Sequence, residues 1–293
     1  MFAVLSALGF AGKAIFIKVA YARTRMDATT LLALRMLFSA PFFAVLVWRA
    51  RNDPSLKPLP RRDWLWLAWL AFLGYYFSSF LDFKSLEYIS AGLERIILFT
   101  YPAWVMLISA AWHRQPIRSR DLVSLALSLL GVVVTFSHDL RLAGSTAGLW
   151  KGAALVFGAS LVYSLYLLGS RAVVLRVGSE RFTGYVVMLA SVCVLGQFAA
   201  TKPLAELSQP ASIYWLSLGL AVVSTVLPIV FLVQALKRVS PSMVAVCSSI
   251  GPFLTILMGA VFLGEPITPL QLAGATLVLA GVGLITMAPP LAD

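Results

Sequence analysis

Apolar residues dominate ten stretches of the chain, and polar residues gather between them. The stretches cover residues 2–20, 28–48, 64–83, 91–111, 121–137, 150–170, 182–200, 212–235, 242–262 and 267–287. A helix needs about 20 mostly apolar residues to cross a bilayer, and each stretch comes near that length. The pattern therefore predicts an all-α membrane protein with ten transmembrane helices. The connecting segments are short, so we expect no soluble domain.

Composition agrees with this prediction. Of the 293 residues, 60% are hydrophobic and 12% are charged, and the mean hydropathy is +0.90. Soluble domains typically carry about 25% charged residues. The chain starts directly in an apolar stretch, without the charged start and cleavage site of a signal peptide, so we expect residues 2–20 to be retained. Cys193 and Cys247 fall inside predicted spans, where we expect small core residues rather than a disulfide.

The chain repeats itself at an offset of 150 residues. Residues 86–135 align with residues 236–285 without a gap, and 12 of the 50 pairs are identical. Leucines and alanines match easily in apolar sequence, so the informative pairs are Ser90/Ser240, Pro102/Pro252, Pro116/Pro266 and Gly131/Gly281. Internal repeats in a membrane chain are typical of transporters. We expect one repeat over residues 1–138, with spans 1–5, and a second over residues 150–288, with spans 6–10.

Five spans in each repeat is an odd number, so the second repeat must enter the membrane from the opposite side. Inverted repeats of this kind are related by a pseudo-two-fold axis in the membrane plane. Their substrate site usually lies at the interface of the repeats, near mid-depth. The symmetry predicts where a site would be without naming its residues.

The net charge of +11 is distributed unevenly over the connectors. With both termini in the cytoplasm, the cytoplasmic connectors hold thirteen Lys and Arg residues and the opposite connectors hold six. Cytoplasmic loops of membrane proteins carry such an excess. We therefore attribute the basic excess to membrane topology, and not to binding of nucleic acid.

Six charged side chains fall inside predicted spans: Lys13, Lys18, Arg35, Asp82, Glu94 and Arg95. A charge at the centre of a membrane helix costs about 2.5–3.5 kcal/mol on insertion scales, so each should face protein or water. Lys18, Arg35 and Arg95 could join Asp82 and Glu94 in an outer network that gates transport, or in a static structural network; Lys18 could also snorkel to the interface. Lys13 lies nearest the midplane and could bind a substrate carboxylate, pair with an acidic residue of the protein, or snorkel.

Aromatic and small polar residues form a second set of candidates. The candidate substrate-binding residues besides Lys13 are Tyr75, Tyr76, Ser79, Tyr101, Tyr163, Tyr166 and Ser249. Tyrosine rings with a few polar tips would suit an aromatic or apolar metabolite, whereas ordinary helix packing would use the same residues. Pro102 and Pro252 interrupt backbone bonding midway through spans 4 and 9, and could act as hinges or only curve the helix.

A family resemblance rests on the end of the chain. The run Gly264-Glu265-Pro266 closes span 9, and span 10 carries Gln271, Gly274 and Gly281-Val282. Together with Lys18, Arg35 and the mid-span prolines, this pattern resembles the drug/metabolite transporter superfamily, EamA type. Within it, the chain is most similar to the bacterial aromatic amino acid exporters (YddG-like). The first repeat departs from the pattern, with Gln115-Pro116 for Glu265-Pro266 and Ser124 for Gly274, and Lys13 stands where a small polar residue is more usual.

The resemblance implies a secondary transporter that works by alternating access. It implies that spans 1, 3, 4, 6, 8 and 9 line a central cavity, that spans 5 and 10 are peripheral, and that no cofactor or metal is needed. The implied partners are a small-molecule substrate and the lipid bilayer, and the implied cargo is an aromatic or other hydrophobic amino acid moved outward. Export of drugs or other small metabolites, or channel-like facilitation, is the alternative. A midplane lysine would repel a cationic drug unless neutral or paired.

Enzyme functions find little support in the sequence. His113 and His138 lie at span ends without the spacing of metal ligands, and no zinc-protease motif, nucleophile elbow or P-loop is present. Asp82 is the only aspartate beyond the first residue of a span, so an intramembrane aspartyl dyad has no second member.

Overall fold

The computed structural model describes residues 1–24, 26–52, 58–113, 117–142, 146–236, 238, 247 and 250–286. Helices account for the regular structure of these residues, and no strand occurs among them. Their bounds in the first half are α1 Phe2–Arg23, α2 Ala28–Asn52, α3 Arg61–Ala71, η1 Phe72–Phe77, α4 Ser78–Ser85, α5 Ala91–Leu98, α6 Tyr101–His113 and α7 Ser119–Leu142. In the second half they are α8 Thr146–Val177, α9 Ser179–Thr201, η2 Leu204–Leu207, α10 Ala211–Ala221, η3 Val222–Val226, α11 Leu227–Leu236, α13 Gly251–Leu263 and α14 Pro269–Thr286.

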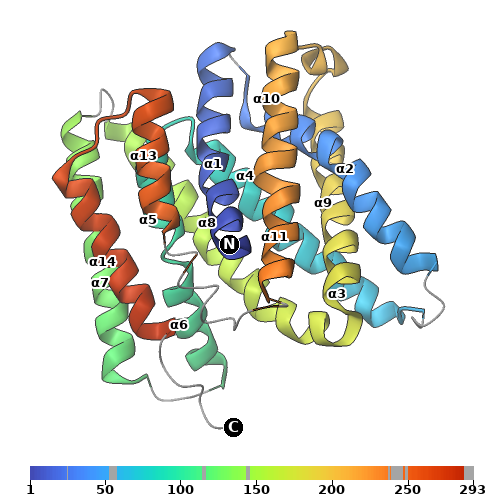
Figure 1. Ribbon diagram of the computed structural model, residues 1–293, viewed down its shortest axis with the longest axis horizontal. Coiled ribbons are helices and arrows are strands. Elements are labelled where there is room, and N and C mark those ends of the chain that lie inside the picture. The colour runs from blue at the N-terminus through green and yellow to red at the C-terminus, as the bar shows by residue number, and fades with distance from the viewer. Residues whose placement is uncertain are drawn as a thin grey trace.

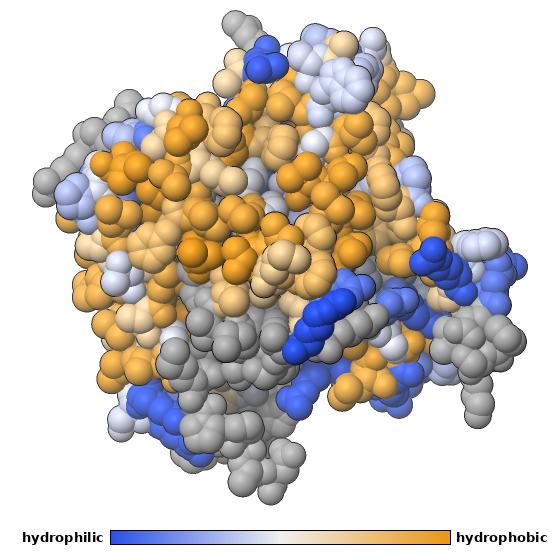
Figure 2. Space-filling model, in the orientation of Figure 1, coloured by the Kyte–Doolittle hydropathy of each residue, from blue (hydrophilic) through white to orange (hydrophobic). Residues whose placement is uncertain are grey.

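Within the part of the chain that the structure describes, eight helical runs are long and apolar enough to cross a membrane, and two shorter apolar helices cover Gly251–Leu263 and Pro269–Leu284. The prediction of an all-helical membrane protein is confirmed for the described residues. The start of predicted span 9, including Ser249, lies outside them. Figure 2 shows a broad hydrophobic surface with polar side chains mostly toward the two ends of the helices, as lipid-facing helices require.

Helix boundaries recur at the offset seen in the sequence. The helices α3 and α10 start at residues 61 and 211, α6 and α13 at residues 101 and 251, and α7 and α14 at residues 119 and 269. Even an uncommon element recurs, because η1 and η3 are both π-helical and start at residues 72 and 222. A π-helical segment holds a wider turn than an α-helix and is rare outside single-turn insertions.

Helix packing follows the same correspondence. Helix α1 packs on α11 and α13 of the other half, as α8 packs on α4 and α6. Helices α2 and α9 pack on each other, and so do α7 and α14, which lie side by side at one edge of the molecule (Figure 1). Each half therefore completes its packing with helices of the other.

Glycines set the close approach of α7 and α14. A Cβ atom added at Gly131 would lie 2.5 Å from the carbonyl oxygen of Gly274, and one at Gly281 would lie 2.6 Å from that of Ser124. Ser124 Oγ donates to the carbonyl of Gly281 over 2.5 Å. The glycines of the sequence motif in span 10 are thus explained by backbone contact between two helices.

Helix α5 ends before the predicted span 4 does. The turn at Phe99 and Thr100 separates α5 from α6, so Pro102 lies in the first turn of a new helix, as Pro252 does in α13. Proline is tolerated there because the first N–H groups of a helix have no partner within it. Pro102 thus follows a break between two helices and Pro252 lies at the start of α13, where the sequence indicated kinks within spans.

Candidate functional site

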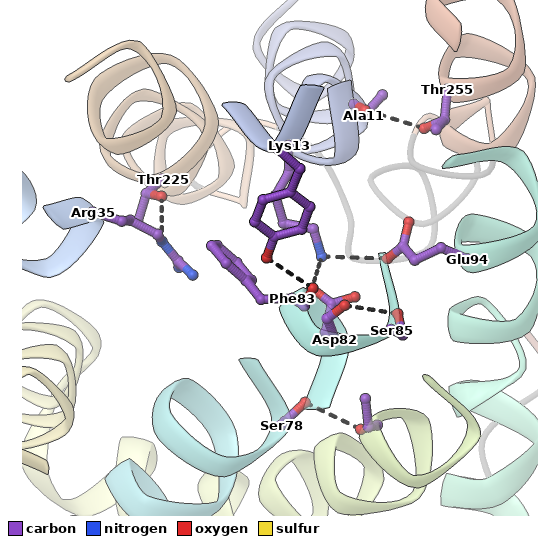
Figure 3. Close-up of polar contacts among 12 residues, drawn as sticks. Ala11, Lys13, Arg35, Ser78, Asp82, Phe83, Ser85, Glu94, Thr225 and Thr255 are labelled. Carbon is purple, nitrogen blue, oxygen red and sulfur yellow. Dashed lines mark hydrogen bonds and ion pairs between the residues drawn. The ribbon is translucent and has the colours of Figure 1, made fainter. Parts of the chain in front are cut away.

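A cluster of buried charges joins three helices of the first half. Lys13 Nζ of α1 lies 2.6 Å from Asp82 Oδ2 of α4 and 3.5 Å from Glu94 Oε1 of α5 (Figure 3). Asp82 is 3% exposed and Glu94 is 0% exposed. Two acidic side chains thus face one lysine in the protein interior. Of the alternatives left open for Lys13, the structure shows pairing with acidic residues of the protein.

Each of these acidic side chains has one oxygen that accepts no hydrogen bond from an N–H or O–H group of the described residues, and the two carboxyl groups lie within hydrogen-bonding distance of each other. Asp82 Oδ1 and Glu94 Oε2 are buried and have no hydrogen-bond partner among the described residues. A buried polar atom without a partner costs about 1–3 kcal/mol or more, and such atoms are few in native proteins. The cluster therefore holds unused acceptors directly beside its lysine.

Arg95 follows Glu94 on α5 but joins neither acid in an ion pair within the described part of the chain. Its guanidinium lies over the ring of Phe99, 5.1 Å from the centroid, and its Nε is buried without a partner. The residue is 7% exposed. Its Nη2 would lie 3.2 Å from a Cβ atom added at Gly251, the first residue of α13. Arg95 thus extends from one half of the chain to the helix start of the other.

Arg35 is separate from the acidic side chains. Its Nε donates to Thr225 Oγ1 of η3 over 3.1 Å, and its guanidinium lies over the ring of Phe83, 5.3 Å from the centroid (Figure 3). The predicted outer network of five charges is therefore divided: its two acids bind Lys13, whereas Arg35 and Arg95 have other neighbours. Thr225 was not singled out in the sequence, although it occupies the position equivalent to Tyr75 at the 150-residue offset.

Lys18 and Glu265 belong to a contact between the C-terminal ends of α1 and α13. Lys18 Nζ donates to the carbonyl of Ile89 over 2.9 Å and lies 4.0 Å from Glu265 Oε1. The same Glu265 oxygen accepts the N–H of Ala91, the first residue of α5, over 3.1 Å. Gly264 adopts φ 67°, a left-handed conformation that favours glycine. The Gly264-Glu265-Pro266 motif thus turns the chain and binds the start of α5. We call the contacts of Lys18 and Glu265 with each other and with the start of α5 the outer clamp, after the orientation predicted from the sequence.

Four of the candidate tyrosines form a continuous row of ring contacts that begins at Phe99. The ring centroids are 6.1 Å apart for Phe99 and Tyr101, and 5.3 Å apart for Tyr101 and Tyr163. The row continues from Tyr163 to Tyr166 over 5.6 Å and ends at Tyr75, 5.8 Å from Tyr166. Because Arg95 lies over Phe99, this aromatic row starts at the charge cluster.

The other candidates lie apart from this row. Tyr76 packs against Phe72, with ring centroids 5.3 Å apart, and Ser79 is half-buried on α4. No hydrogen bond, ion pair or ring contact joins either residue to the charge cluster in the described part of the chain. Ser249 lies outside the described residues. Among the described residues, no group of three or more His, Cys, Asp or Glu side chains lies together as a metal site would require.

Serines of α8, also missed in the sequence, bind the break in span 4. Ser164 Oγ donates to the carbonyl of Tyr101 over 3.0 Å, and Ser160 Oγ donates to that of Leu98 over 3.4 Å. The Leu98 carbonyl is the one that Pro102, lacking an N–H, cannot bond. The break is therefore satisfied by side chains of the other half.

Known proteins are similar to this chain in sequence and in fold. The EamA-like transporter family matches residues 1–137 and again residues 150–287. The uncharacterized transporter YcbK of Bacillus subtilis (strain 168) is 32% identical over 284 residues, which cover 94% of this chain and 88% of YcbK. The threonine/homoserine exporter RhtA of Escherichia coli (strain K12) is 27% identical over 209 residues, 69% of this chain and 64% of RhtA.

A solved crystal structure has the same fold, with a TM-score of 0.62, 17% sequence identity, and coverage of 96% of this chain and 95% of the other. The relatives named here are transporters, and the likeness to YcbK spans nearly the whole chain. The protein is a multi-pass membrane protein that belongs to the EamA-like transporter family.

Proposed function

We propose that the protein is a secondary transporter that exports aromatic or other hydrophobic amino acids across the bacterial inner membrane by alternating access. The observation that carries the proposal is the buried cluster of Lys13, Asp82, Glu94 and Arg95. This cluster has two hydrogen-bond acceptors and one donor without partners among the described residues, and it lies next to the start of α13. Intramembrane ionisable residues are rare and typically mark a substrate or ion pathway. RhtA, named as an exporter of threonine and homoserine, supports amino acids in general as the cargo.

The proposed architecture is two inverted repeats of five spans, residues 1–138 and 150–288, with both termini in the cytoplasm. The recurrence of helix starts at a 150-residue offset supports it. So does the packing of α1 and α8 on equivalent helices of the other half. Helices α7 and α14 lie together at the edge, which supports peripheral spans 5 and 10 (Figure 1).

In alternating access, contacts close the transporter on one side of the membrane while the other side is open, and these contacts break when their own side opens. The outer clamp supplies such contacts, because Lys18, Glu265 and the start of α5 come from both halves and meet near the outer ends of the helices. In the proposed cycle the outer clamp opens to release cargo. The breaks at Pro102 and Pro252 supply hinge positions beside the charge cluster.

An aromatic side chain of the cargo would find matching surfaces in the row from Phe99 to Tyr75. Aromatic pairs prefer edge-to-face or offset geometry with centroids 4.5–7 Å apart, and every contact of the row falls in that range. A second candidate cargo is a small polar amino acid, which the name of RhtA favours.

Counterflow into liposomes that hold the purified protein tests both cargoes. Liposomes preloaded with unlabelled tryptophan, phenylalanine or threonine are diluted into the labelled amino acid, and empty liposomes serve as the control. We expect saturable uptake of labelled tryptophan and phenylalanine. Uptake of threonine alone would replace the aromatic cargo by the second candidate, and uptake of none of the three would contradict amino acid transport.

A further inference from the structure

Three buried atoms find no hydrogen-bond donor or acceptor to pair with among the residues that the structure describes: Glu94 Oε2 and Arg95 Nε on α5, and Asp82 Oδ1 on the neighbouring α4. Two of the atoms are acceptors and one is a donor. Lys13 already binds the second oxygen of each acid, at 2.6 and 3.5 Å, so it does not satisfy these atoms. A static charge network that only fixes helix positions has no reason to leave both kinds of atom unsatisfied, because each adds a desolvation cost.

The surroundings of Arg95 favour an anion. The N-terminus of a helix carries a partial positive charge and N–H groups without helical partners. The guanidinium of Arg95 lies against the start of α13, a helix of 13 residues, close to Gly251. Two positive groups repel each other, and an anion that lies near both offsets this repulsion. A carboxylate is a suitable anion, because its two oxygens match the planar donors of arginine. Glycine at position 251 leaves this approach open, because a side chain there would meet Arg95.

The surroundings of the two acids favour a cation. Asp82 and Glu94 carry two carboxyl groups and share a single lysine. Their free oxygens could both accept hydrogen bonds from one primary ammonium group, which has three donors. The binding of such a group would also balance the charge of the second acid.

We propose that these atoms bind the charged head group of an α-amino acid. The α-carboxylate binds Arg95 and the start of α13, and the α-ammonium group binds Asp82 Oδ1 and Glu94 Oε2. Lys13 holds the two acids in place and is a positioning residue. The aromatic row that begins at Phe99 then receives the side chain of the substrate. This inference rests on the proposed function and specifies which atoms would recognise the substrate.

Competition by analogues tests the head group without any mutation. Labelled tryptophan uptake is competed with tryptophan, with tryptamine, which lacks the carboxylate, and with indole-3-propionate, which lacks the ammonium group. If threonine is the labelled cargo that works, its amine and deaminated analogues take their places. We expect both analogues to compete at least tenfold more weakly than the amino acid. Equal competition by either analogue would overturn the inference while leaving amino acid transport intact.

Two variants test which residue binds the carboxylate and which binds the ammonium group of the substrate. Arg95→Met should reduce the preference for tryptophan over tryptamine to near one, and Glu94→Gln should reduce the preference over indole-3-propionate. Arg35→Met is the matched control, because it removes another buried arginine that binds Thr225 and not the cluster, and it should keep both preferences. Unchanged preferences in Arg95→Met and Glu94→Gln would overturn the assignment. If a variant does not fold, the analogue panel on the native protein still decides.

Discussion

The two halves of the molecule share their backbone and differ in their chemistry. Both have a π-helical segment in the third span of the half, and both have a proline in the first turn of the following helix, α6 or α13. Five charged residues inside the spans of the first half have uncharged counterparts at the 150-residue offset: Lys13, Arg35, Asp82, Glu94 and Arg95 correspond to Tyr163, Tyr185, Leu232, Val244 and Ala245. The comparison indicates that the repeated elements form the framework, whereas the proposed site depends on residues that break the repeat.

The largest effect should come from removing the cation of the cluster. In Lys13→Met, two buried carboxyl groups lose their shared partner, and breaking a buried ion pair from one side costs roughly 3–5 kcal/mol. The equivalent change in the other half, Tyr163→Phe, removes one hydroxyl and should cost less than about 1.5 kcal/mol. Thermal unfolding of the detergent-solubilised variants measures both. Similar costs for the two variants would show that the charge asymmetry does not matter for stability.

Where the halves remain equivalent, equivalent substitutions should cost the same. Gly131→Ala and Gly281→Ala each place a Cβ atom against a backbone carbonyl across the contact of α7 and α14. Overpacking of this kind typically costs about 1–3 kcal/mol. Gly196→Ala is the control, because nothing lies within 4 Å of its added Cβ atom. The same unfolding assay should find both variants destabilised and the control unchanged; a large difference between the two would break the equivalence of the halves.

An intermediate effect is expected at the outer clamp, whose glutamate, Glu265, is replaced by Gln115 at the equivalent position of the first half. Glu265→Ala removes the acceptor for the N–H of Ala91 and the neighbour of Lys18. Loss of a helix cap typically costs ~1 kcal/mol. Glu265→Gln keeps an acceptor and reproduces Gln115, the equivalent residue of the first half, so it should cost less. A cysteine introduced near the outer clamp should react faster with a thiol reagent in Glu265→Ala than in Glu265→Gln. Equal reaction rates in the two variants would show that the clamp does not control opening on that side.

The smallest effect concerns an ion pair between the halves at the outer end. Lys202 Nζ lies 2.9 Å from Asp27 Oδ2. Burial raises the pKa of the Asp27 carboxyl, but hydrogen bonds from Thr30 and Lys202 outweigh it and hold the pKa below its ordinary value. A lowered pKa in the folded state adds stability above the unfolded pKa of about 3.9, and that stability is lost as the pH falls through the folded value.

Because this pair is partly exposed, its contribution should stay below ~1 kcal/mol. The difference in unfolding temperature between the native chain and Asp27→Asn, measured from pH 7 down to pH 3, should shrink as the pH falls. A difference that stays constant over this range would show that Asp27 does not contribute through its charge.

The sequence predicted the helical membrane fold because apolar stretches near the length of a bilayer have few other structures available. It also singled out the charged residues that the structure brings together as Lys13, Asp82 and Glu94, since charges within apolar stretches are rare enough to be noticed individually. It could not give their pairing. Lys13 is 69 residues from Asp82 and 81 from Glu94, and which side chains meet depends on how each helix is rotated about its axis. The π-helical turns and the break at Thr100 leave the hydrophobic pattern unchanged, so they were equally hidden.

The π-helical segment at residues 72–77 has a consequence for changes in chain length. Successive residues of an α-helix are about 100° apart around its axis, and a π-helical turn accommodates an additional residue. Because the wider turn absorbs this residue, deleting one residue there should give a regular α-helix and leave α4 close to its present rotation. A deletion within α4, between the π-helical segment and Asp82, is not absorbed in this way and should rotate Asp82 by about 100° away from Lys13. The π-helical segment is therefore the part of this span that should tolerate a one-residue deletion best.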